Sequence, residues 1–226
     1  MSQPGHTLAD ERAGRSTRAW VVLLAVIAFG LVTDLGSKWL AFEKIAGSPV
    51  VVERERVLQI AADEGPKAIG RVLPAHEPVV VVPHVLELSL VLNPGAVFGI
   101  GPGKRWFFVA FTVGAMIAGV ALFAKGTRAK QPAAHIAIGL LISGGLGNLY
   151  DRLTFGCVRD FLHPLPDVPW PFGISTPWSG RMIWPYVSNI ADLWLIVGIV
   201  MLVAILWRAD KAREAARLKA TAGTAS

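Results

Sequence analysis

The stretch SNIADLWLIVGIVMLVAILW, residues 188–207, restricts the fold of this chain more than any other feature. After Asp192 it contains only apolar residues and one glycine until Trp207. A run of this length and composition is typical of a helix that crosses a lipid bilayer. A carboxylate in or near hydrocarbon costs about 3 kcal/mol. The position of Asp192 at the start of this run therefore requires a structural or functional reason.

Three further apolar blocks precede this one, and together the four indicate a membrane protein. Of the 226 residues 53% are hydrophobic and only 17% are charged, which is a low charged share for a soluble domain. The third block is rich in small residues, which permit close approach of helices. The sequence predicts an all-α integral membrane protein with four transmembrane helices rather than a soluble all-helical core. The blocks are residues 19–42, 106–124, 133–150 and 186–207.

Basic residues predict the orientation of the four helices. They flank the start of the first block, the short connection between the second and third blocks, and the end of the fourth block, and such residues concentrate in cytoplasmic segments. We therefore expect cytoplasmic tails at 1–18 and 209–226, a membrane domain at 19–208, and outer loops at 43–105 and 151–185. The flanking residues are Arg12, Arg15, Arg18, Lys125, Arg128, Lys130, Arg208, Lys211, Arg213, Arg217 and Lys219.

Several other interpretations of the chain are less favoured. A cleavable signal peptide is the rival for the first block, but the block is longer than a usual signal core and lacks a clear cleavage site. The net charge of +6 does not indicate nucleic acid, because the basic residues stand at the ends of apolar runs. Cys157 is the only cysteine, and no His-Glu-x-x-His spacing occurs. We expect no metal and no cofactor.

The two outer loops differ in character. Residues 43–78 mix charges and give no clear structural signal, whereas residues 79–100 are β-branched and partly alternating, with a turn at Asn93-Pro94-Gly95. The first outer loop is therefore predicted to contain a small extracytoplasmic β-rich element. The second loop, 151–185, is rich in Pro, Trp and Gly, and its aromatic residues suit a membrane–water interface.

Under this topology, the polar residues in or beside the apolar blocks gather at the outer membrane face. The first and third blocks run outward and the fourth runs inward, so the polar residues named below lie in or beside their outer ends. Chance scatter would place some of them at the inner ends. The residues concerned are Asp34, Lys38, Asn93, Asn148, Asp151, Arg152, Asp160, Asn189 and Asp192.

Asp160 and Asp192 are carboxylates to which the sequence assigns no obvious shared cation. Two carboxylates brought together repel, so that one pKa rises and a proton is shared between them. The ionised partner can then remove a proton from water while the protonated partner polarises a carbonyl, as in the aspartic-protease dyad. A helix start near Asn189 favours the ionised form of Asp192, which makes Asp192 the candidate base.

Two functions of other classes remain open from the residues alone. A proton-coupled carrier would use Asp34, Asp151 and Asp192 as a relay, although carriers usually contain repeats and place such groups near the midplane. A non-catalytic scaffold would leave the pair Asp160 and Asp192 unexplained. Asp34 and Lys38, four residues apart, also suit a purely structural ion pair.

Four motifs occur in order along the chain: DLGSK, NPGAVFGI, GGLGNLYDRLTFGCVRDF and NIADLWLIVG. In order and spacing they resemble the motifs of the lipoprotein signal peptidase family, the type II signal peptidases of bacterial membranes. The resemblance covers roughly residues 19–208.

The resemblance implies an aspartyl endopeptidase that removes the signal peptide from diacylglyceryl-modified prolipoproteins, cutting before the lipid-bearing Cys at the outer face of the bacterial inner membrane. It implies Asp160 and Asp192 as the catalytic dyad, with water as the nucleophile. The partners would be these lipid-modified substrates and membrane lipids, without nucleic acid, and we expect a monomer. Residues implied to support the dyad or contact substrate are Asp34, Lys38, Asn93, Gly95, Asn148, Asp151, Arg152 and Asn189.

The chain departs from the family pattern near the dyad. Ser188 stands where the family has an aromatic residue, and Arg159 stands where an apolar residue is usual. A cation at Arg159 would lower the pKa of Asp160 if its side chain turned inward. The loop 43–83 is also longer than the family pattern suggests.

Overall fold

The protein is built around four long apolar helices. The structure, a computed structural model, describes residues 11–95, 105–177 and 179–223. Within these ranges four helices are long and apolar enough to cross a bilayer, as the apolar blocks predict. α5 continues well beyond Trp207, into the predicted tail. The helices are α1 (Thr17–Lys44), α3 (Arg105–Ala121, continued by a π-helical turn at Leu122–Gly126), α4 (Pro132–Thr154) and α5 (Ile190–Gly223).

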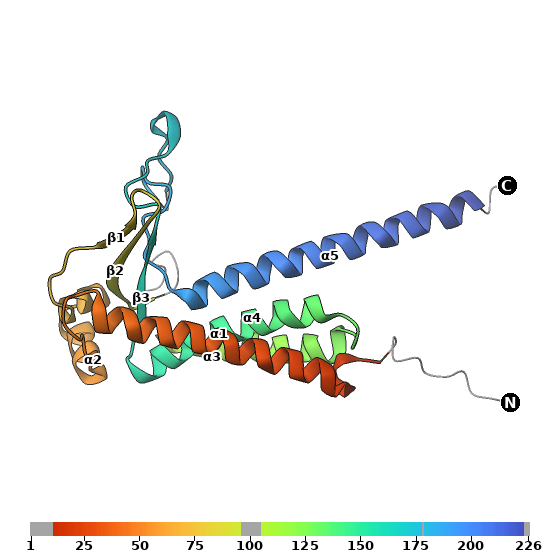
Figure 1. Cartoon of the computed structure of the whole chain (residues 1–226), viewed down its shortest axis with the longest axis horizontal. Coiled ribbons are helices and arrows are strands. Elements are labelled where there is room, and N and C mark those ends of the chain that lie inside the picture. Colours follow the sequence, from red (N-terminus) through yellow and green to blue (C-terminus); the bar gives the residue numbers. More distant parts are fainter. Residues whose placement is uncertain (1–10, 96–104, 178, 224–226) are drawn as a thin grey trace.

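Glycines allow α4 and α5 to approach closely. A Cβ atom added at Gly144 of α4 would fall on the carbonyl oxygen of Ala191 in α5, and one at Gly198 of α5 would fall on the carbonyl oxygen of Ala137 in α4. Only hydrogen fits between the two backbones at these points, so the small residues of the third block have the packing role expected of them. α4 also contacts α1 and α3, and is the central helix of the bundle (Figure 1).

The basic segment before α1 and the basic segment in the last part of α5 lie at one end of the bundle (Figure 1). The segment before α1 is bound to the connection between α3 and α4. Ala13 N–H donates to Thr127 O at 3.0 Å, and Ala129 N–H donates to Glu11 O at 2.9 Å. All three segments that the positive-inside argument uses are thus at the same end, as predicted.

A three-stranded antiparallel sheet stands at the opposite end of the bundle and projects to one side of it (Figure 1). The predicted strand region contributes β1 (Val79–Val82) and β2 (Leu86–Asn93); its continuation at 96–100 lies outside the described residues. β3 (Val158–Pro164), from the second outer loop, pairs with β2. The β-rich element therefore draws on both predicted outer loops, not on the first alone.

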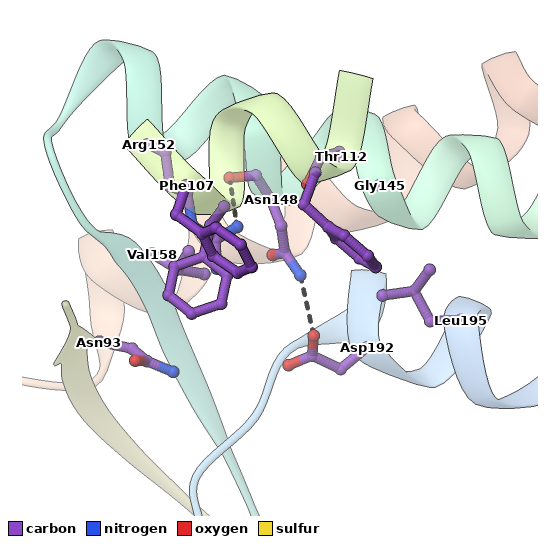
Figure 2. A pocket seen from close by; sticks show the side chains of 11 residues that line it. Asn93, Phe107, Thr112, Gly145, Asn148, Arg152, Val158, Asp192 and Leu195 are labelled. Carbon is purple, nitrogen blue, oxygen red and sulfur yellow. Dashed lines mark hydrogen bonds between the residues drawn. The ribbon is translucent and has the colours of Figure 1, made fainter. Parts of the chain in front are cut away.

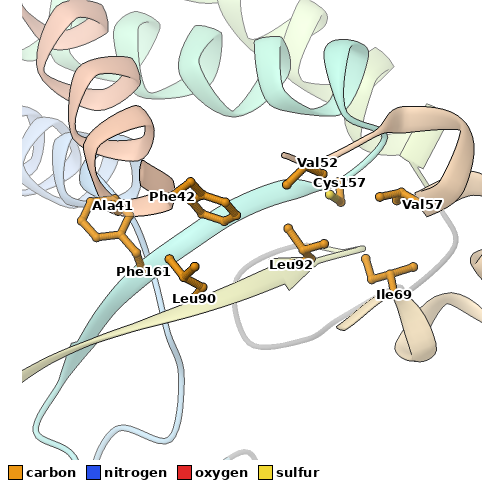
Figure 3. Close-up of a cluster of buried hydrophobic side chains, with 9 residues drawn as sticks. All are labelled: Ala41, Phe42, Val52, Val57, Ile69, Leu90, Leu92, Cys157 and Phe161. Atoms are coloured by element: carbon orange, nitrogen blue, oxygen red, sulfur yellow. The ribbon is translucent and has the colours of Figure 1, made fainter. Parts of the chain in front are cut away.

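The loop without a clear sequence signal folds into α2 (Arg54–Asp63) and a 3-10 segment (Pro66–Val72). These pack over one face of the sheet and the end of α1 (Figure 3). Removal of this apolar surface from water fixes the sheet to the helix bundle, at about 25 cal/mol per Å². The buried cluster consists of Ala41, Phe42, Val52, Val57, Ile69, Leu90, Leu92, Cys157 and Phe161.

Two backbone hydrogen bonds form a bridge that joins the two ends of the loop between β3 and α5. Ser188 N–H donates to Leu162 O at 2.7 Å, and Leu162 N–H donates back to Ser188 O at 2.8 Å. Ser188 is thus bound to β3 through its backbone, which does not depend on an aromatic side chain at this position. The bridge brings the start of α5 beside Asp160, although the two are far apart in sequence.

Candidate active site

Asp192 is held by the first turn of α5. Asn189 is the residue before the helix, and its Oδ1 accepts from Asp192 N–H at 3.0 Å. In return, Asn189 N–H donates to Asp192 Oδ2 at 3.4 Å. This reciprocal arrangement is a capping box, which satisfies N–H groups that a helix start leaves free. The predicted helix start near Asn189 is confirmed, and Asp192 has a local structural role.

Asp160 lies on β3 with only 1% of its surface exposed. Its register partner on β2 is Val91, so Asn93 stands diagonally across from it on the same face of the sheet. Asn93 Nδ2 donates to Asp160 Oδ2 at 3.1 Å, and Asn189 Nδ2 donates to Asp160 Oδ1 at 2.6 Å. The carboxyl is thus fixed on both oxygens.

Two asparagines join the carboxyls of Asp160 and Asp192. Asn148 Nδ2 donates to Asp192 Oδ1 at 2.8 Å, while its Oδ1 accepts from Asn189 Nδ2 at 3.1 Å. Burial, followed by the nearby negative charge of Asp192, raises the pKa of Asp160 to about 8. Burial therefore favours the protonated form of this carboxyl.

Asp34, Lys38 and Asp151 form a buried ion network behind these carboxyls. Lys38 Nζ lies 2.9 Å from Asp34 Oδ2 and 3.3 Å from Asp151 Oδ2, and it donates to Asn148 Oδ1 at 3.1 Å. Asp34 Oδ1 also accepts from Ala191 N–H at 2.9 Å. The network therefore fixes both the first turn of α5 and the amide of Asn148.

Arg159 turns away from Asp160. Neighbouring residues on a strand point to opposite faces, and Arg159 Nη2 lies 2.9 Å from Asp151 Oδ1, with the guanidinium 4.1 Å from the ring centre of Phe155. The inward orientation that would have lowered the pKa of Asp160 does not occur. Arg159 instead binds Asp151, which explains why that carboxylate is absent from the pair formed by Asp160 and Asp192.

Arg152 connects α4 to the turn after β2. Its Nη2 donates to Gly95 O at 2.8 Å and its Nη1 donates to Asn148 O at 3.1 Å. The turn is itself fixed by Gly95 N–H, which donates to Asn93 Oδ1 at 2.9 Å. With this contact, every predicted site residue, from Asp34 to Asp192, belongs to one connected cluster.

A cavity of about 360 Å³ opens beside Asp192 (Figure 2). Asn93, Asn148 and Arg152 face it with polar atoms, and most of the remaining wall is apolar. The side chains that α3 contributes to the wall were not predicted from the sequence. They are Phe107, Phe108, Phe111 and Thr112. The three phenylalanines belong to an aromatic run at the outer end of a predicted helix, which is the signal that points to this wall.

An apolar cavity of about 230 Å³ adjoins the first one. The two share Phe111, Thr112, Gly145 and Leu195 in their walls, and the second continues between α3, α4 and α5 toward Leu202. Together they make an apolar groove that leads from the carboxyl pair along the helices. Such a groove suits a hydrocarbon chain.

Cys157 is close to this site but is chemically inert. It is 1% exposed, and burial raises the pKa of its thiol to about 12. The thiolate is the nucleophilic form of cysteine. The buried thiol is therefore unsuited to act as the nucleophile.

The fold and the site define a helical membrane enzyme with paired carboxyls at the end of an apolar groove. Residues 26–208 match the family described as Signal peptidase (SPase) II, and the chain therefore belongs to the signal peptidase II family of aspartic endopeptidases. A lipoprotein signal peptidase of Desulfitobacterium hafniense is 32% identical over 158 residues, covering 70% of this chain and 87% of the relative. One of Pelotomaculum thermopropionicum is 35% identical over 160 residues, covering 70% and 93%.

A solved structure agrees with this assignment. A bacterial membrane enzyme determined by the in meso method at 2.3 Å resolution superposes with a TM-score of 0.54 and 26% identity. The match covers 84% of this chain and 87% of that one.

Proposed function

We propose that this enzyme removes signal peptides from diacylglyceryl-modified prolipoproteins by cutting before the lipid-bearing Cys, with Asp160 and Asp192 as the catalytic dyad. The relatives carry the name lipoprotein signal peptidase. The observation that carries the proposal is Asn189, whose amide nitrogen binds Asp160 while its amide oxygen binds the backbone of Asp192. It holds two carboxyls together beside a cavity open to an apolar groove.

The two carboxyls take different roles in this mechanism. Asp192, which accepts hydrogen bonds from Asn148 Nδ2 and Asn189 N–H and lies in the first turn of α5, is the ionised base. Asp160, with its pKa raised to about 8, is the protonated acid. Asp192 takes a proton from water, the resulting hydroxide attacks the scissile carbonyl carbon, and Asp160 gives its proton to the carbonyl oxygen.

Collapse of the tetrahedral intermediate completes the reaction. Asp192 gives its proton to the leaving nitrogen as the C–N bond breaks, and a hydroxyl proton of the intermediate returns to Asp160. The products are a new carboxyl on the signal peptide and a free amino group on the lipid-bearing Cys. Both aspartates end in their starting protonation states.

The apolar groove suits the lipid part of the substrate. Acyl chains would lie along Phe111, Leu195 and Leu202, with the scissile bond at Asp192. Arg152 and Asn93 face the same cavity and would bind the substrate backbone. The depth of the carboxyl pair in the membrane would then match the depth at which a lipid-anchored substrate presents its scissile bond.

The orientation is part of the proposal. The basic segments at one end of the bundle support a cytoplasmic location for both termini. The sheet and the carboxyl pair would then lie at the extracytoplasmic face of the bacterial inner membrane. We further propose that the enzyme acts as a monomer without a cofactor. No specific observation favours the carrier or scaffold alternatives.

Cleavage of a purified diacylglyceryl-modified prolipoprotein tests the dyad. Asp160→Asn and Asp192→Asn are each expected to lower kcat by about a hundredfold or more, since each removes an acid–base group. Asp210→Asn, an exposed aspartate on α5 far from the site, is the matched control and keeps wild-type turnover. Asp151→Asn keeps partial activity, because Asp151 supports the site through Lys38 and Arg159.

Folding and substrate controls make the result interpretable. The melting temperature of each variant shows that folded protein is being assayed, and an unlipidated prolipoprotein tests the lipid requirement. Turnover within severalfold of wild type in both folded Asn variants would refute the dyad. Equal cleavage of the unlipidated substrate would refute the groove as an acyl-chain site.

A further inference from the structure

A cavity of about 510 Å³ lies at the other end of the bundle, between the first turns of α1 and α4. It is separate from the carboxyl pair on β3 and α5, which lies near the opposite ends of these two helices. Its walls combine two cations with an apolar side. The lining residues that matter are Glu11, Ser16, Arg18, Val22, Lys130 and His135.

The walls of this inner cavity are held by hydrogen bonds. Ala129 N–H donates to Glu11 O at 2.9 Å, and Arg128 N–H donates to Gln131 Oε1 at 2.8 Å. His135 is 1% exposed, and its Nε2 donates to Arg128 O at 3.1 Å. The backbone around the cavity is therefore set in place before any ligand arrives.

The charges of the inner cavity favour an anion. Arg18 and Lys130 are exposed, and neither forms an ion pair with the residues that the structure describes. The start of α4 also borders the cavity through Pro132 and His135, although Pro132 has no N–H and the N–H groups of Ala134 and His135 already donate to Gln131 O. The positive end of the helix dipole adds to the attraction of the two cations for an anion. Glu11 is the one carboxylate among the described residues of the wall.

Apolar residues lie beside these cations. Ala19 and Val22 belong to the first turns of α1, the point where that helix becomes continuously apolar. A small inorganic anion makes no favourable contact with these apolar side chains, whereas a phospholipid presents a phosphate next to glycerol and acyl chains. We propose that the inner cavity binds the phosphate group of an anionic phospholipid of the cytoplasmic leaflet. The proposal rests on the orientation proposed above but not on the peptidase chemistry.

Titration of the full-length protein in a neutral detergent with short-chain phosphatidylglycerol tests this site. We expect a saturable rise in melting temperature, because a ligand that binds the folded state stabilises it. Phosphatidylcholine, which has a phosphate but no net charge, and inorganic phosphate, which has no acyl chain, are expected to give much smaller rises at equal concentration. These two arms separate charge and lipid source.

Charge variants locate the site. Arg18→Gln with Lys130→Gln is expected to weaken the apparent affinity for phosphatidylglycerol about tenfold, since the two substitutions remove two exposed charges, each of which contributes modestly. Glu11→Gln is expected to strengthen it, an outcome that damage to the fold cannot produce. Arg208→Gln with Lys211→Gln removes the same charge from the exposed end of α5 and should leave the affinity unchanged.

The proposal has clear contrary outcomes. An equal response to phosphatidylcholine would show that charge is not recognised, and an equal response to inorganic phosphate would show that the ligand is not a lipid. Unchanged affinity in the Arg18 and Lys130 double variant, or equal loss in the Arg208 and Lys211 control, would overturn the assignment to this cavity.

Discussion

Replacement of Lys38 by methionine should destabilise the protein more than any other single change of a charged side chain on α1. Lys38 is fully buried and lies 2.9 Å and 3.3 Å from oxygens of Asp34 and Asp151. At an effective dielectric constant of about 20, the Coulomb attraction between Lys38 and each carboxylate is about 5 kcal/mol before desolvation is counted. Desolvation of the three charges offsets much of this attraction. Methionine keeps the volume but leaves Asp34 without a cation.

The net cost follows from the charge that is left behind. Breaking a buried pair by removing one partner costs about 3–5 kcal/mol, and we expect Lys38→Met to lie in this range. The free energy of unfolding is measured by titration from neutral detergent into sodium dodecyl sulfate, with circular dichroism as the signal. Lys44→Met, an exposed lysine at the end of the same helix, is the matched control and should cost less than about 1 kcal/mol.

A double variant separates charge from packing. Lys38→Met with Asp34→Asn removes the uncompensated carboxylate while keeping an oxygen for Ala191 N–H, so it should be more stable than Lys38→Met alone. The reasoning is refuted if Lys38→Met costs no more than Lys44→Met. It is equally refuted if the second substitution destabilises the protein further.

Three further outcomes are expected. Gly147→Ala should lose about 2 kcal/mol or more, because the added Cβ falls on Asp34 Oδ2, whereas Gly36→Ala, with open space around it, should change stability by less than about 1 kcal/mol; unfolding titrations of both check this. The folded pKa of Asp160, about 8, exceeds the ordinary value of 3.8, so its stabilising contribution is full below about pH 4 and is lost as pH rises through 8. Asp160→Asn removes this loss. Its stability relative to wild type should therefore rise with pH between these values by at most about 1.4 kcal/mol per pH unit, and a flat difference would contradict the buried carboxyl. The Cys157 thiol, with its pKa near 12, should resist maleimide at pH 7 until the protein is unfolded, and rapid labelling of folded protein would show that the cluster around it is open.

Some contacts of the site are between residues close in sequence and could be inferred from their spacing, whereas others depend on the pairing of distant strands. The capping box at Asn189 and Asp192 and the ion pair of Asp34 with Lys38 are contacts within one helix turn, so that their spacing is visible in the sequence. The direction of Arg159 depends on β3, which exists because residues far away supply β2. Once that strand is known, alternation places Arg159 opposite to Asp160.

The aromatic wall of the cavity was not predictable from spacing alone. Phe107, Phe108 and Phe111 sit in a helix that is apolar on all sides, so periodicity does not distinguish a groove-facing residue from a lipid-facing one. The helix α2 was missed for a related reason: its few apolar residues, such as Val57, acquire a partner only when the sheet is present.

The backbone bridge between Leu162 and Ser188 makes the loop between these two residues structurally independent of the carboxyl pair. Both ends of the loop between Leu162 and Ser188 are held together by the two backbone hydrogen bonds. The relative position of Asp160 and Asp192, which lie outside this loop, therefore does not depend on the length of the loop. A change in the length of this segment should therefore leave the geometry of the carboxyl pair unaltered. The same property offers an attachment point for a reporter, at the tip near Phe172, that leaves the carboxyl pair undisturbed.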